Sequence, residues 1–165
     1  MNAGAYGGEM SQVLKTVTSL TEDGDIVVRK ASECGFGYRK SIFMENREII
    51  LSADFSLTKG DPMEIKNKID DLNRQRAEKQ PLNYPSAGSF FKRPMGHFAG
   101  RLIEDAGLKG LQIGGAQVSE LHAGFIINKG RATPEDVIAL MRAVQKTVFD
   151  KFGVKLEPEV QIIGL

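Results

Sequence analysis

The segment YPSAGSFFKRP, residues 84–94, holds a serine hydroxyl between small residues and two phenylalanines, with a Lys-Arg pair directly after them. Ser89 could act as a nucleophile, but a hydrolase elbow reads G-x-S-x-G, and here Phe90 and Phe91 follow the serine. No histidine or acidic residue has the spacing of a triad partner. From these residues alone, a hydrogen-bonding turn explains Ser89 as well as catalysis does.

A second candidate is the glycine-rich start of the chain, MNAGAYGGE. Residues without a Cβ let backbone N–H groups approach an anion closely, so this segment could cradle a phosphate. It matches neither G-x-x-x-x-G-K-[ST] nor G-x-G-x-x-G between a strand and a helix. A turn explains it equally well.

Each of the other side chains that could take part in catalysis or binding is, taken alone, only weak evidence for a function. His97 and His122 are more often packed or solvent-facing than catalytic, and Cys34 is most simply a small core residue. The cations from Arg74 to Lys79 fit the solvated end of a helix, where positive charge also suits the macrodipole.

Composition excludes several classes. The 165 residues carry a net charge of +1 with both signs interspersed, so a nucleic-acid partner is not expected. One cysteine and two histidines cannot build a closed zinc site or an internal disulfide, and we expect no metal. No apolar run approaches the ~20 residues that cross a bilayer, and the N-terminus lacks signal-peptide character. We therefore expect a cytoplasmic domain without a membrane partner.

The first sixty residues are predicted to form mainly strands and turns. VLKTVTSLTEDGDIVVRK predicts a hairpin that turns at EDGD, and REIILSADF predicts a strand with Ile49, Leu51, Ala53 and Phe55 on one face. The glycine-rich segment between them, ASECGFGYRKSIF, is predicted to be a loop or short helical turn that carries Arg39.

Helical signals begin at Asp61. Asp61 is a candidate N-cap, Pro62 suits the first helical position, and Ile65, Ile69 and Leu72 make a narrow apolar stripe. A short helix is predicted near HFAGRLIEDAG, with Phe98, Leu102 and Ala106 inward.

The clearest helix is TPEDVIALMRAVQKTVFDKFG, capped by Thr133, with Pro134 at N1 and Asp136 at N3, and ended by Gly153. Its apolar stripe consists of Val137, Leu140, Met141, Val144 and Val148. Two short strands are predicted on either side of Gly114-Gly115, and a last strand interrupted by Pro158 is predicted at an edge. The pattern favours an α+β fold, with helices on one face of a mostly antiparallel sheet.

Taken together and in order, six segments resemble the C-terminal part of the UDP-N-acetylenolpyruvoylglucosamine reductase family. These segments are MNAGAYGGE, GYRKSIF, PSAGSFFKRP, AGRLIEDAGLKGLQIGGAQVSELHAGFIIN, ATPEDVIALM and GVKLEPEVQIIG. The resemblance covers nearly the whole chain. It implies that residues 1–60 are the tail of a two-part FAD-binding domain of the PCMH type, and that residues 61–165 are an α+β substrate-binding domain.

The resemblance also implies a flavoenzyme that uses NADPH and FAD to reduce UDP-N-acetylglucosamine enolpyruvate to UDP-N-acetylmuramate in peptidoglycan synthesis. Family members carry an N-terminal FAD-binding region that this sequence does not show. We therefore expect a fragment in which Met1 is internal to a longer protein. Such a fragment is expected to be inactive alone, to hold FAD weakly and to be monomeric.

Three residues match the family's catalytic set. Ser89 resembles the proton donor, Arg39 the arginine that binds the growing carboxylate charge, and Glu159 the catalytic glutamate, which we expect to be protonated when substrate is bound. A serine hydroxyl is a weak acid, but its position can matter more than its acidity. The rings after Ser89 are expected to hold it in a partly dry pocket.

The resemblance assigns binding roles to two further sets. The cofactor set is Asn2, Gly4, Ala5, Tyr6, Gly7 and Arg39. The substrate set is Tyr38, Arg76, Lys79, Ser89, Arg93, Gln117 and His122. Arg76, Lys79 and Arg93 are the expected clamp for the diphosphate, and Arg93 stands where some members have asparagine. Ser119 lies in the same stretch as Gln117 and His122.

Two other functions are compatible with these residues. One is a flavin-free module that binds UDP-sugars without redox chemistry. The other is an inert truncated product that binds no UDP-sugar.

Overall fold

The computed structural model describes residues 1–164, which form two compact units, Met1–Pro62 and the residues from Met63 onward. The division falls two residues after the predicted boundary. All strand pairings are antiparallel, and the helices belong with the second unit, so the α+β prediction is confirmed. No helix among the described residues is long and apolar enough to cross a membrane.

The first unit begins with a hairpin of β1 (Gly4–Ala5) and β2 (Gly8–Glu9), followed by a three-stranded sheet in the order β4-β3-β5. The strands are β3 (Leu14–Leu20), β4 (Ile26–Lys30) and β5 (Ile49–Phe55). The predicted turn at EDGD is confirmed, since Gly24 has φ 89° and Thr21 N–H donates to Asp25 O. Short 3₁₀ turns, η1 (Met10–Gln12), η2 (Ala31–Glu33) and η3 (Ile42–Met44), complete the unit.

The interior of the first unit is small. Val17 and Cys34 are its buried apolar residues in the described chain, and burial raises the pKa of the Cys34 thiol, as expected for a small core residue. Glu48 accepts hydrogen bonds from Arg29 and from the fully buried Ser19, and these bonds lower the pKa of Glu48. By contrast, Ile49, Leu51 and Phe55 of the predicted apolar face of β5 remain exposed, and Ala53 is half-buried.

The second unit contains α1 (Pro62–Lys79), β6 (Ser86–Ser89), α2 (Ala99–Asp105), β7 (Gln112–Ile113), β8 (Ala116–Val118), β9 (Phe125–Asn128) and α3 (Pro134–Phe152). Its sheet has the order β6-β9-β8-β7. Pro62 occupies the first position of α1 as predicted, but α1 buries none of its residues. The two strands predicted on either side of Gly114-Gly115 are confirmed as β7 and β8, and a further strand, β9, follows that the sequence did not separate from β8.

The capping prediction for α3 is confirmed in detail. Thr133 Oγ1 accepts the N–H of Asp136, Pro134 is the first helical residue, and Gly153 ends the helix with φ 68°. Leu140, Met141, Val144 and Val148 are buried, so the predicted stripe is the face that packs inward.

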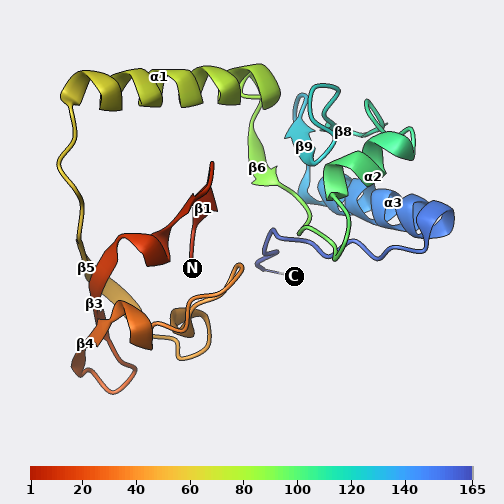
Figure 1. Cartoon of the computed structure of the whole chain (residues 1–165). Helices are drawn as coiled ribbons and strands as arrows, with labels where there is room; N and C mark the ends of the chain where they lie inside the picture. Colours follow the sequence, from red (N-terminus) through yellow and green to blue (C-terminus); the bar gives the residue numbers. More distant parts are fainter. Residues whose placement is uncertain (165) are drawn as a thin grey trace. The chain divides into compact units, whose positions relative to one another are not determined.

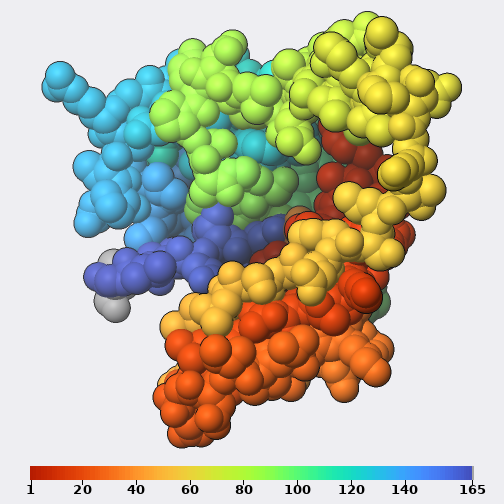
Figure 2. All heavy atoms as spheres, turned by 90° about the vertical axis from the view of Figure 1, so that its left-hand side faces the viewer, coloured from red at the N-terminus to blue at the C-terminus, as the bar shows by residue number. Residues whose placement is uncertain are grey.

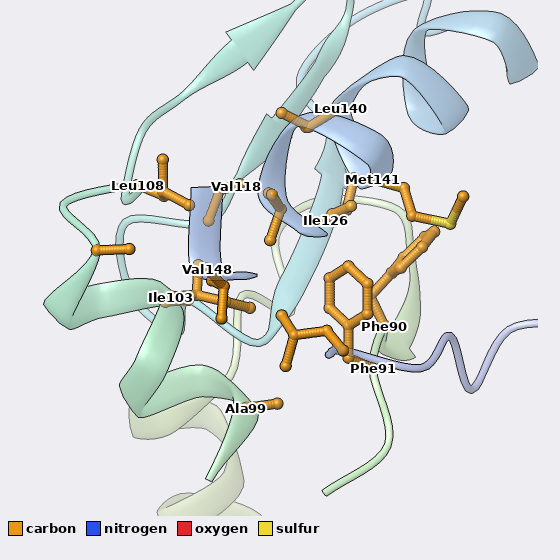
Figure 3. Packing of buried hydrophobic residues seen from close by; sticks show 14 of the residues in the cluster. Phe90, Phe91, Ala99, Ile103, Leu108, Val118, Ile126, Leu140, Met141 and Val148 are labelled. Atoms are coloured by element: carbon orange, nitrogen blue, oxygen red, sulfur yellow. The ribbon is translucent and has the colours of Figure 1, made fainter. Parts of the chain in front are cut away.

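The core of the second unit lies between one face of its sheet and the helices α2 and α3. In Figure 3, Ile103 lies beside Val148, Leu108 lies beside Val118, and Ile126 lies near Met141, all within one buried cluster. Phe90 and Phe91 close one end of this core, with ring centroids 5.4 Å apart in an edge-to-face arrangement. The rings after Ser89 therefore anchor its strand.

Two predictions of local structure are wrong. Phe98 is 61% exposed because it precedes α2, and the guanidinium of Arg93 lies 3.9 Å from the centre of its ring. The last strand is reduced to one isolated bridge between Phe91 and Pro158, because Pro158 has no N–H to extend the ladder.

Candidate functional site

Ser89 lies at the end of β6, directly after a β-bulge. The pairing of β6 with β9 shifts register between Ser86, opposite Ile127, and Ser89, opposite Phe125. Gly88 has φ 79° at this shift, a conformation that L side chains rarely adopt. Bulges of this kind re-aim a neighbouring side chain. Ser89 is exposed, so the residues of the second unit do not themselves form the partly dry pocket that was expected.

The tail of the chain pairs with the segment that follows Ser89. Glu159 N–H donates to Phe90 O at 2.9 Å, and Lys92 N–H donates to Glu157 O at 2.8 Å, on either side of the Phe91–Pro158 bridge. In Figure 2 the tail crosses the surface of the second unit next to the segment that contains Ser89, and Figure 1 shows the same neighbourhood. Backbone pairing therefore brings Glu159, which is half-buried, close to Ser89.

Ser89 belongs to the sheet face opposite α2 and α3. Its cross-strand partner Phe125, like Ile127 two residues on, is buried outside the helix-covered core that contains Ile126. Gln117 is paired with Ile127 and lies on the same face. Ser89 and Gln117 are thus displayed on one surface by neighbouring strands.

A pocket of about 460 Å³ opens on this surface, within the size range of small-ligand sites. Its lining includes Gln80, Tyr84, Gln117, Ser119, Ile127 and Lys129. Lys129 Nζ donates to Tyr84 Oη at 3.0 Å, a hydrogen bond that raises the pKa of Lys129. Gln117 was predicted to bind substrate. Tyr84 and Lys129 were not predicted, because nothing in their local sequence distinguishes them from ordinary surface residues.

The predicted diphosphate clamp is exposed but distributed over two elements. Arg76 and Lys79 lie in the last turn of α1, next to the pocket residue Gln80, and Arg93 follows the core phenylalanines. Arg93 Nε donates to His97 O at 3.3 Å, while its guanidinium lies over Phe98. Arg93 is therefore held in a defined orientation.

His122 lies in the turn between β8 and β9. Its Nδ1 accepts the N–H of Gly124 at 3.0 Å, and its ring meets Phe125 edge-on at 5.0 Å. Ser119, which is almost fully buried, accepts the N–H groups of Leu121 and His122. Both side chains shape this turn, whatever else they contact.

In the first unit, Arg39 occupies a tight turn. Gly37 and Lys40 exchange two backbone hydrogen bonds of 3.2 Å, and Arg39 adopts φ 55° between them. Its guanidinium carbon lies 5.7 Å from the centre of the exposed Tyr38 ring. Such strain in a non-glycine residue is often found at functional positions.

Four of the predicted cofactor residues, Gly4, Ala5, Tyr6 and Gly7, lie in the hairpin of β1 and β2. Tyr6 and Gly7 make its tip with φ 52° and 82°, and a Cβ on Gly7 would meet no atom within 4 Å. This exposed backbone fits the close approach of a phosphate or a flavin. Asn2 is buried, and its Oδ1 accepts the N–H of Ser11 at 2.9 Å, so Asn2 fixes the start of the hairpin.

The described residues contain no group of three or more metal-ligating side chains. The candidate groups in the second unit are the hydroxyl of Ser89, the nearby Glu159 and a pocket whose lining includes the amide groups of Gln80, Asn83 and Gln117. A pocket with such groups suits a polar organic ligand.

Comparison with known proteins gives the family. The family model described as "UDP-N-acetylenolpyruvoylglucosamine reductase, C-terminal domain" matches residues 80–163, just over half of the chain. The chain belongs to this family.

Curated relatives with the name UDP-N-acetylenolpyruvoylglucosamine reductase match almost the whole chain. The protein from Latilactobacillus sakei is 57% identical over 164 residues, and that from Caldanaerobacter subterraneus is 56% identical. Each match covers 99% of this chain and 54% of the relative, so the chain spans about half the length of the curated relatives it matches.

A solved structure has the same fold. The crystal structure of UDP-N-acetylenolpyruvylglucosamine reductase from Thermus caldophilus matches with a TM-score of 0.84 at 38% identity. This match covers 98% of the chain and 57% of the solved chain.

Proposed function

We propose that this chain supplies the substrate-binding part of an oxidoreductase that reduces UDP-N-acetylglucosamine enolpyruvate to UDP-N-acetylmuramate, with FAD and NADPH as cofactors. The names of its relatives support this activity. The observation that carries the proposal is the backbone pairing that brings Glu159 beside the residue after Ser89. We further propose that the enzyme acts as a monomer in the cytoplasm.

The chain's own residues would handle the proton and the carboxylate. FAD, if bound and reduced by NADPH, would supply the hydride for the β-carbon of the enolpyruvyl group. Ser89 would then donate a proton to the α-carbon, which completes reduction of the double bond. Arg39 and Glu159 would bind the substrate carboxylate, where negative charge grows during the reaction.

Binding of the nucleotide sugar is the second part of the proposal. The pocket next to Gln117 would take a polar portion of the substrate, since amide and hydroxyl groups line it. Arg76, Lys79 and Arg93 carry exposed positive charge that suits a diphosphate. Tyr38 and His122 remain proposed substrate contacts, and residues 4–7 with Arg39 remain proposed cofactor contacts.

The test is Ser89→Ala in a version of the protein extended at its N-terminus to the full length of its relatives. Flavin reduction by NADPH should stay near the parent rate, while reduction of the enolpyruvyl substrate should slow by ~10² to 10⁴. Ser86→Ala, an exposed serine of the same strand, is the matched control and should leave both half-reactions unchanged. Equal loss of both half-reactions in Ser89→Ala would refute the role of Ser89.

The colour of the purified protein and calorimetric titration with UDP-sugar distinguish the reductase from the two alternative functions. A reductase should purify yellow at full length and bind UDP-sugar saturably. A flavin-free binding module would titrate with UDP-sugar but remain colourless, and an inert product would show no saturable heat.

A further inference from the structure

We propose that His122 is a positioning residue for Ser89, acting through two successive hydrogen bonds at Gly124 rather than only through contact with a ligand. The inference rests on the proposed function in one respect, that Ser89 is the proton donor. The geometry that supports it lies wholly within the second unit, in the β8–β9 turn and the adjacent β6 strand.

The first link fixes the tautomer of His122. Gly124 N–H can only donate, so the Nδ1 atom that accepts it at 3.0 Å carries no hydrogen. The neutral ring must then carry its hydrogen on Nε2. A hydrogen on Nδ1 would place two donors against each other, so this hydrogen bond requires the Nε2–H tautomer.

The ring lies in a slot that two glycines leave open. A Cβ on Gly124 would come 2.9 Å from His122 Cε1, and one on Gly100 of α2 would come 3.3 Å from the same atom. The edge of the ring packs against Phe125, with centroids 5.0 Å apart and planes inclined at 74°. The imidazole therefore occupies a defined place between α2 and the turn.

The second link connects this turn to Ser89. The carbonyl oxygen of Gly124 accepts the N–H of Phe90 at 2.8 Å, directly after the β-bulge. Phe125, which touches the imidazole, is the cross-strand partner of Ser89. One residue, Gly124, thus donates its N–H to the imidazole of His122 and accepts the N–H of Phe90, next to Ser89, at its carbonyl oxygen. Loss of the imidazole acceptor should loosen the strand at this point.

Two variants distinguish the hydrogen-bond acceptor of His122 from the volume of its side chain. His122→Asn keeps a polar group near the position of Nδ1, whereas His122→Leu fills the slot without an acceptor. Amide hydrogen exchange at Phe90 should accelerate by about 10- to 100-fold in His122→Leu and stay within about threefold of the parent in His122→Asn. Core amides of α3, such as that of Val144, should exchange at parental rates in both variants.

A spectroscopic measurement tests the tautomer without any substitution of His122. Imidazole ¹⁵N shifts at pH 8 should show His122 as the Nε2–H form, and His97→Asn, which removes the other histidine, assigns the signal. An Nδ1–H signal would overturn the proposal. This spectrum can refute the first link of the proposal even if His122→Leu does not fold.

Other outcomes would also overturn it. One is equal exchange rates at Phe90 in His122→Asn and His122→Leu. Another is acceleration of the α3 amides along with Phe90, which would reveal general destabilisation. At full length, His122→Leu should lower kcat for substrate reduction more than it raises KM, with recovery in His122→Asn. None of the exchange or shift measurements depends on reductase activity, so they can fail while the proposed function stands.

Discussion

The backbone N–H of Glu159 donates a 2.9 Å hydrogen bond to the carbonyl oxygen of Phe90, the residue directly after Ser89. Two residues from remote parts of the chain are therefore joined through the main chain. Because no side-chain atom of Glu159 takes part in this bond, substitution of its carboxyl group should leave the pairing in place. Substitution of the Glu159 carboxyl group therefore tests its proposed chemical role without removing this backbone pairing.

Glu159→Gln at full length should keep the parent melting temperature and lower the rate of substrate reduction by ~10² to 10⁴, because an amide cannot exchange the proton of a carboxyl group. Stopped-flow measurement of the oxidative half-reaction gives the rate. Glu157→Gln is the matched control, since Glu157 pairs with Lys92 at 3.3 Å on the surface of the same segment. A Glu159→Gln variant with parental turnover would remove Glu159 from the catalytic set.

Gly115→Ala should lower the free energy of unfolding by about 3 kcal/mol, as expected for overpacking of a rigid site. The added Cβ would lie 2.3 Å from Gly130 O and 2.4 Å from Ala132 N, and both are backbone atoms. Urea titration of the chain measures the change. Gly130→Ala is the control, because a Cβ there would meet no atom within 4 Å. Equal stability of the two variants would contradict the close approach at Gly115.

Asp136 should contribute to stability in a pH-dependent way. Its carboxylate accepts the backbone N–H groups of Thr133 and Gly115, at 3.0 and 3.1 Å, and these bonds lower its pKa from the ordinary value of 3.8. For a group whose pKa is depressed by folding, the stabilisation is complete above the unfolded pKa and disappears as pH falls through the folded one.

The stability advantage of the parent over Asp136→Asn should therefore be constant near neutral pH and shrink below about pH 4. Urea titrations between pH 2.5 and 7 measure it. Glu135→Gln removes a carboxylate from the same turn that accepts neither of these bonds, so its profile shows the general effect of charge. An advantage that grows towards acid would contradict the assigned cause.

Local signals in the sequence were sufficient for much of the fold. The caps of α3 at Thr133 and Gly153 were predictable because side-chain caps and αL glycines act over a few residues. The EDGD turn was predictable for the same reason. β9 was missed because a short buried strand and a loop have similar local patterns, and pairing with β6 and β8 determines it.

The site was predictable only through family resemblance. Ser89, Glu159 and Gln117 belong to segments that resemble the family, but the bulge at Gly88 and the pairing of Phe90 with Glu159 depend on distant strands. For Phe98, the local sequence pattern led to a wrong prediction. Its spacing fitted an inward position, yet it precedes the helix and lies under Arg93. Periodicity cannot show which residue of a helical pattern comes before the first turn.

The late position of Glu159 along the chain affects how the protein is made. Phe90 leaves the ribosome well before Glu159 has been translated. The carbonyl oxygen of Phe90 therefore lacks its Glu159 partner, and is hydrated or loosely contacted, while the intervening helices form. The nascent polypeptide thus passes through a stage in which the segment after Ser89 has not yet paired with the tail.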